Sequence, residues 1–67
     1  MLQKHSLTIN GHATSITLEP EFWDALKTIA ARKNIALAAL VADVDQTRGN
    51  QNLSSALRVF VLKQFIK

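Results

Sequence analysis

Two short stretches, residues 6–9 and 12–18, alternate between polar and apolar side chains, which is the pattern of half-buried β-strands. They are separated by Asn10-Gly11, a dipeptide that favours the two left-handed positions of a tight hairpin turn. A two-residue turn places Ile9 opposite His12 and, further along, Leu7 opposite Thr14 and His5 opposite Ile16. The pattern therefore predicts two antiparallel strands, over about residues 5–9 and 12–18.

In this register the two strands agree on which face of the sheet is apolar, which supports the pairing. The apolar face carries Leu7, Ile9, Ile16 and Leu18, and the polar face carries Lys4, Ser6, Thr8, Ala13, Ser15 and Thr17. We expect the first face to pack on the core and the second to face outward.

A helix is predicted from about residue 20 to residue 33, directly after the second strand. Pro20 suits the first helical position, and Glu21 and Asp24 add negative charge to the first turn. Asn34 is a plausible left-handed residue for ending the helix. Its apolar stripe consists of Phe22, Ala25, Leu26, Ile29 and Ala30.

Two more helices are predicted, over about residues 36–47 and 52–66, with Arg48-Gly49-Asn50-Gln51 as the linker between them. The first lacks a good capping side chain at Ala36 and carries Leu37, Leu40, Val41 and Val44 on one face. The last is apolar around more than half of its circumference, so we expect neighbours on both sides. The expected fold is mainly α with a short N-terminal β-ribbon, in a single domain over residues 1–67.

The chain has 67 residues, of which 48% are hydrophobic, and no cysteine that could form a disulfide. This is more apolar surface than so small a chain easily buries, and the second strand also needs a partner at its edge. We therefore expect an obligate homodimer with a shared core. The expected core residues are Ile16, Leu18, Phe22, Leu26, Ile29, Leu40, Val41, Val44, Leu57, Phe60 and Val61.

The charge and hydropathy of the chain exclude few classes of function. The net charge of +3 is compatible with an anionic partner without demanding one. The longest apolar run, residues 35–42, is too short to span a membrane, and residues 1–5 do not resemble a signal peptide. A cytoplasmic protein without a membrane partner is the expectation.

The order of strand, turn and helices resembles the ribbon-helix-helix family. The likeness is carried by residues 14–26, Leu40-Val41 and residues 52–62. Together with Gly11-His12 before the strand, these residues resemble a bacterial subgroup of small stand-alone ribbon-helix-helix domains. The resemblance implies an intertwined homodimer with an additional C-terminal helix. It also implies that the strands of two chains pair antiparallel, and that the polar face of this ribbon enters the major groove of DNA.

Carried over by position, the resemblance assigns DNA contacts to Ala13, Ser15 and Thr17 on the ribbon. The start of the second helix, at Ala36 and Leu37, would offer backbone N–H groups to a phosphate. Lys4 on the flanking strand is the nearest positive charge. The chain departs from the family at position 13, which is commonly a long basic or polar residue, and at position 36, which is often serine.

No constellation of side chains predicts catalysis, a metal or a cofactor. His5 and His12 have no carboxylate or thiol at ligand spacing. Ser54 and Ser55 are interpreted as helix-capping residues rather than nucleophiles, and the third helix is expected to begin at Asn52 or Ser54, both of which are good caps. Trp23 is interpreted as half-buried packing rather than as a base-stacking side chain. The first hypothesis is a dimeric DNA-binding transcriptional regulator with no enzymatic activity and no small-molecule substrate. The alternative is a dimeric protein-interaction module of the same fold.

Overall fold

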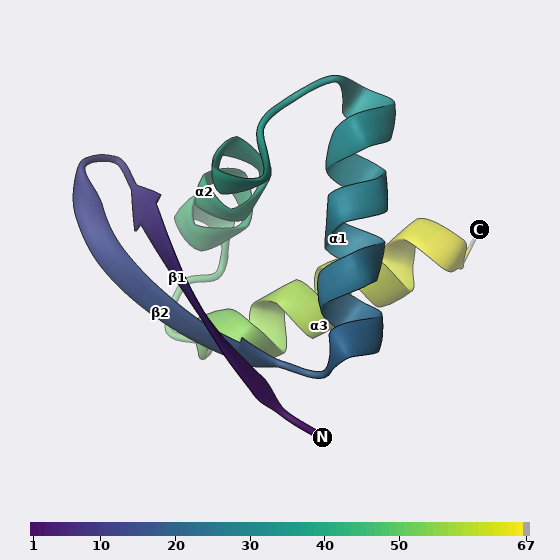
Figure 1. The fold of residues 1–67 in the computed structure, drawn as a ribbon, viewed down its shortest axis with the longest axis horizontal. Helices are drawn as coiled ribbons and strands as arrows, with labels where there is room; N and C mark the ends of the chain where they lie inside the picture. Colours follow the sequence, from purple (N-terminus) through teal and green to yellow (C-terminus); the bar gives the residue numbers. More distant parts are fainter. Residues whose placement is uncertain (67) are drawn as a thin grey trace.

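The computed structural model describes residues 1–66, which form a two-stranded antiparallel sheet followed by three helices (Figure 1). The expected fold class, helical with an N-terminal β-ribbon, is confirmed. Lys67, the last residue of the expected domain, lies outside the described residues. The elements are β1 (Gln3–Ile9), β2 (His12–Leu18), α1 (Pro20–Lys33), α2 (Leu37–Thr47) and α3 (Leu53–Phe65).

The hairpin forms in the predicted register, because the turn adopts the backbone that Asn-Gly favours. Asn10 and Gly11 have φ of 53° and 80°, and Ile9 lies opposite His12. β1 begins at Gln3, earlier than the expected start near residue 5. The reason is that the pairing continues to Gln3 opposite Leu18, so every residue of β1 has a partner on β2.

The turn after α1 ends the helix in the way that Asn34 predicts. Asn34 has a left-handed φ of 57°, and its N–H donates to the Ala31 carbonyl at 3.1 Å. The N–H of Ile35 donates to the Ala30 carbonyl at 3.0 Å, which completes the capping pattern. These bonds satisfy carbonyls that the helix leaves free and turn the chain toward α2.

α2 ends at Thr47, as predicted, but its start and both ends of α3 lie one residue inside the predicted bounds, because the flanking residues have extended backbone. Ala36 (ψ 147°) precedes α2 without a side-chain cap. Asn52 (ψ 137°) precedes α3, and its Oδ1 accepts a hydrogen bond from the Ser55 N–H at 3.2 Å. Ile66 (ψ 128°) follows the last turn of α3. Of the two predicted caps of the third helix, Asn52 is therefore the correct one. The interpretation of Ser54 and Ser55 as capping residues is wrong, because both lie inside α3 and Ser54 Oγ instead accepts a hydrogen bond from the Thr17 N–H.

The three helices lie on one side of the sheet, and the core forms between them and the apolar face of the hairpin (Figure 1). α3 contacts α1, α2 and β2, so it closes the core within one chain. Leu57 and Val61 of α3 are buried, whereas Leu62 and Phe65 are exposed. The core consists of Ile9, Ile16, Leu18, Leu26, Ile29, Ala30, Leu40, Val41, Val44, Ala56, Leu57 and Val61, with Phe22 and Phe60 packed against it.

Candidate nucleic-acid interface

The face of the hairpin that points away from the helices is polar, as the alternation predicts. Lys4, Ser6, Thr8, Ala13 and Ser15 are exposed on it, and Thr17 is half-buried. The register sets these side chains side by side in three cross-strand pairs: Lys4 with Thr17, Ser6 with Ser15, and Thr8 with Ala13. The structure thus brings four of the six predicted DNA-binding residues, Lys4, Ala13, Ser15 and Thr17, onto one continuous face.

The chemistry of this face suits phosphates and base edges but carries little sequence preference. Ser6, Thr8, Ser15 and Thr17 present hydroxyl groups, which both donate and accept hydrogen bonds. Lys4 adds one positive charge. None of these side chains makes the paired contacts to a base that Arg, Asn or Gln can make.

The outer edge of β2 carries backbone groups that β1 does not use. Ile9 and His12 flank a two-residue turn and therefore form a hydrogen-bonded pair. Along an antiparallel strand, the backbone groups of successive residues point alternately toward the partner strand and away from it. The N–H and C=O groups of Ala13, Ser15 and Thr17 therefore point away from β1. The N–H of Thr17 donates to Ser54 Oγ at 3.2 Å. The N–H groups of Ala13 and Ser15 make no hydrogen bond within residues 1–66.

An ion pair reinforces this junction between β2 and α3. Arg58 Nε lies 2.9 Å from Glu19 Oε1, and both side chains are about one-third exposed. The hydrogen bond from Arg58 lowers the pKa of Glu19 below its ordinary value. Because Glu19 compensates its charge, Arg58 does not count among the cations that are free to bind a phosphate.

The remaining two predicted DNA-binding residues, Ala36 and Leu37, do not belong to the sheet face but lie at the start of α2. They follow the loop after the C-terminal end of α1, and this end of the helix is the one farther from β2 (Figure 1). Ala36 is exposed and Leu37 is half-buried. With no side-chain cap, the N–H groups in the first turn of α2 have no partner inside the helix. They form a separate site that favours an anion only weakly.

Trp23 is half-buried, as expected, but its partner is a residue that the sequence did not suggest. The His5 ring stacks on the indole, with ring centroids 3.6 Å apart and planes 2° from parallel. His5 Nε2 is buried and has no hydrogen-bond partner among the described residues. The strand register could have predicted this contact, because it sets His5 on the core side of β1, beside the start of α1. His5 is therefore a packing residue, and residues 1–66 contain no metal-binding cluster.

A family model described as the ribbon-helix-helix domain matches residues 2–65. The chain belongs to the ribbon-helix-helix domain family. No curated protein and no solved structure gives a significant match. Because the matched range includes β1 and α3, the hairpin and the third helix lie within the family model. Members of this family are generally DNA-binding regulators and typically form dimers.

No helix among residues 1–66 of this ribbon-helix-helix domain is both long enough and apolar enough to cross a membrane.

Proposed function

We propose that this ribbon-helix-helix domain is a dimeric DNA-binding transcriptional regulator whose polar sheet face contacts the major groove. The observation that carries the proposal is the composition of that face, with four hydroxyl groups and a lysine and no large apolar side chain. The net charge of +3 favours a polyanionic ligand. In this proposal residues 1–67 act as one cytoplasmic domain, without cofactor or catalysis.

The dimer is proposed to form through the free edge of β2. Ala13 and Ser15 each have a backbone N–H that is directed outward, whereas the N–H of Thr17 is occupied by Ser54. The pairing that uses only free groups sets Ala13 of one chain opposite Ser15 of the other, with the twofold axis at Thr14. The result is a four-stranded sheet with β2 of each chain at the centre and β1 at the edges.

The burial of the predicted core residues indicates how much of the core a second chain has to cover. Of the eleven predicted, only Phe22 and Phe60 are incompletely buried within one chain. The second chain is therefore needed less for covering the core than for satisfying the strand edge. The proposal keeps the homodimer and moves its main contact to β2.

The width of such a sheet predicts how it would meet DNA. Three strand spacings of about 4.8 Å span about 14 Å before side chains are added, whereas the major groove is about 12 Å wide. The sheet would lie across the groove, with Ser15 and Thr17 over the base edges and the two Lys4 side chains on the outer strands beside the phosphates. Ala36 and Leu37 would add backbone N–H contacts to a flanking phosphate.

This geometry predicts binding that depends on phosphates and discriminates little between sequences. Titration of duplex DNA at several salt concentrations should show log affinity falling linearly with log salt. Lys4→Gln removes two cations per dimer, so the slope should shrink by about 1.8. Lys27→Gln is the matched control, because Lys27 lies on α1 and pairs with Asp24 at 3.6 Å.

Strand pairing is tested separately with Ser15→Pro. The N–H of Ser15 points away from β1, so proline leaves the hairpin bonds intact while removing a donor from the free edge. Sedimentation should show the wild type as a dimer at micromolar concentration and the variant as a folded monomer. A variant that remains dimeric would show that the chains meet elsewhere.

The second candidate is a dimeric protein-interaction module that does not bind DNA. It is favoured by Ala13, which has no polar atom at a central position of the face, and by the uncapped Ala36. Absence of DNA binding even at low salt, with the dimer intact, would select this candidate.

A further inference from the structure

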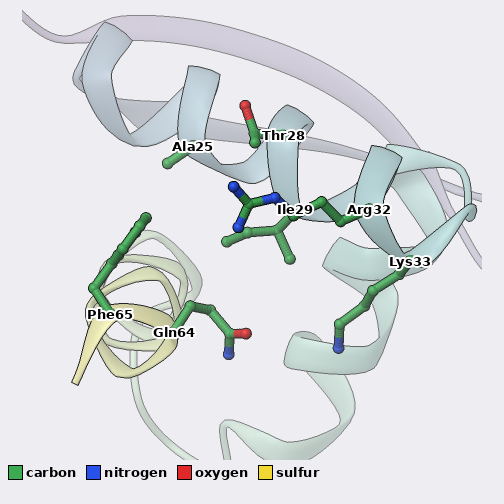
Figure 2. Close-up of a pocket in the computed structure, with 7 residues that line it drawn as sticks. All are labelled: Ala25, Thr28, Ile29, Arg32, Lys33, Gln64 and Phe65. Carbon is green, nitrogen blue, oxygen red and sulfur yellow. The ribbon is translucent and has the colours of Figure 1, made fainter. Parts of the chain in front are cut away.

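A groove of about 260 Å³ lies between α1 and the C-terminal end of α3 (Figure 2). On the α1 side it is lined by Ala25, Thr28, Ile29 and Arg32, which recur at helical spacing on one face. On the α3 side the Phe65 ring points toward Ala25 (Figure 2). Gln64 lines the groove from the same helix. The apolar part of the groove is formed by Ala25, Ile29 and Phe65, and the groove is large enough for side chains from another helix.

The apolar surface continues beyond the groove along α3. Val59, Leu62 and Phe65 form a stripe at intervals of three residues, and Ile66 follows. Their exposed fractions are 39%, 56%, 68% and 61%, which are high for side chains of this size. A contiguous exposed apolar surface beside a groove is typical of a protein-binding site.

The charged residues that line the groove are both cations. Arg32 and Lys33 line it and are exposed. Neither has a carboxylate within ion-pair distance in the described range, and Lys33 instead lies over the Phe60 ring at 5.8 Å. Unlike Arg58, which Glu19 neutralises, these two cations are free to pair with a ligand.

We infer that this groove, together with the apolar stripe of α3, binds an acidic amphipathic helix of a partner protein. Apolar side chains of that helix would enter between Ile29 and Phe65, and its carboxylates would pair with Arg32 and Lys33. Anchoring by apolar groups with charge complementarity at the rim is the usual composition of such interfaces.

The charges favour this occupant over a second copy of the chain. A twofold contact between the grooves of two copies would set Arg32 and Lys33 of one copy against the same residues of the other, and like charges oppose association. A nucleic acid would pair with the cations but would leave Leu62, Phe65 and Ile66 exposed to water. Only an acidic segment with apolar side chains satisfies both parts of the surface.

The inference does not depend on DNA binding. The groove lies on the helical side of the molecule, and the C-terminal end of α3 is far from the hairpin turn (Figure 1). The polar sheet face and the groove could therefore be occupied at the same time.

The test uses a fluorescein-labelled synthetic helix of about 18 residues, long enough to hold helical structure. Leucines are set at intervals of three and four residues, a few glutamates flank the leucine face, and alanines fill the other positions. A second peptide carries lysine in place of each glutamate. Anisotropy titrations with the full chain should detect binding of the glutamate peptide only. Arg32→Glu should weaken that binding at least about tenfold. Lys27→Glu, on the same helix but outside the groove, should leave it within about twofold.

A second variant separates the groove from general electrostatics. Phe65→Ser changes a side chain that is 68% exposed, so circular dichroism should show an unchanged fold while peptide binding is lost. Equal binding of the two peptides, or no effect of Arg32→Glu, would overturn the inference. So would displacement of the peptide by duplex DNA, or sedimentation showing that Phe65→Ser alone dissociates the dimer.

Discussion

The backbone N–H of Thr17 donates a hydrogen bond to Ser54 Oγ at 3.2 Å, joining the outer edge of β2 to the first turn of α3. The two residues are 37 positions apart in the chain. The bond satisfies one edge donor within the chain and leaves those of Ala13 and Ser15 available.

Ser54→Ala should therefore lower the free energy of unfolding by about 1 kcal/mol, since it leaves a partly buried N–H without an acceptor. Urea unfolding followed by circular dichroism measures the loss. Ser55→Ala is the matched control, because no hydrogen bond involves the Ser55 side chain within residues 1–66. Equal losses in the two variants would mean that the bond does not stabilise the fold.

Ile16→Asp should unfold the protein. Ile16 is 2% exposed, and an unpaired carboxylate at this position costs more than about 4 kcal/mol. A small domain has only about 5 kcal/mol or little more to lose. Ser15→Asp adds the same charge one residue earlier, on the exposed face, and should stay folded by circular dichroism. If Ile16→Asp stayed folded instead, the assignment of the two sheet faces would be reversed.

Glu19→Gln should change how stability depends on pH. The hydrogen bond from Arg58 lowers the folded-state pKa of Glu19 below 4.5, so the native state favours the charged carboxylate. The stabilisation is present above pH 4.5 and is lost as the pH falls through the lower folded-state pKa. Urea midpoints of wild type and variant should differ above pH 4.5 and converge below it. Glu21→Gln, at an exposed position outside the ion pair, is the matched control variant.

His5→Ala should expose the indole of Trp23. The stacked ring covers one side of the indole at a centroid distance of 3.6 Å, and such pairs contribute about 0.5–1.5 kcal/mol beyond burial. We expect the fluorescence emission of Trp23, the only tryptophan, to shift to longer wavelength, with a stability loss of this size. His12→Ala, at the exposed start of β2, should leave both unchanged.

Ala13→Arg should tighten DNA binding by about tenfold, because a guanidinium at this position can contact a base edge or a phosphate. The salt dependence should steepen by as much as about 1.8 if both arginines of the dimer reach phosphates. Titrations of the wild type and the variant at two salt concentrations measure both effects. Binding by neither protein at low salt would contradict the proposed function and favour the interaction module.

The hairpin and the helix bounds follow from local chemistry and could be predicted from the sequence. Asn10-Gly11 favours one turn geometry, and the turn then sets the whole register and the inward side of each strand. Pro20 and Asn34 mark the two ends of α1, and Asn52 caps α3. Each signal lies within a few residues of the structure that it predicts, so no knowledge of the remaining chain is needed.

The contacts that organise the candidate sites join residues far apart in the chain, and local patterns do not contain them. Three such contacts form only when α3 and β1 pack against the other elements of the fold. They are Ser54 with Thr17, Arg58 with Glu19, and His5 with Trp23. α3 is apolar around most of its circumference, so its period alone does not tell which side is buried. Packing against α1, α2 and β2 buries Leu57 and Val61 and leaves Leu62 and Phe65 exposed, and that asymmetry creates the groove.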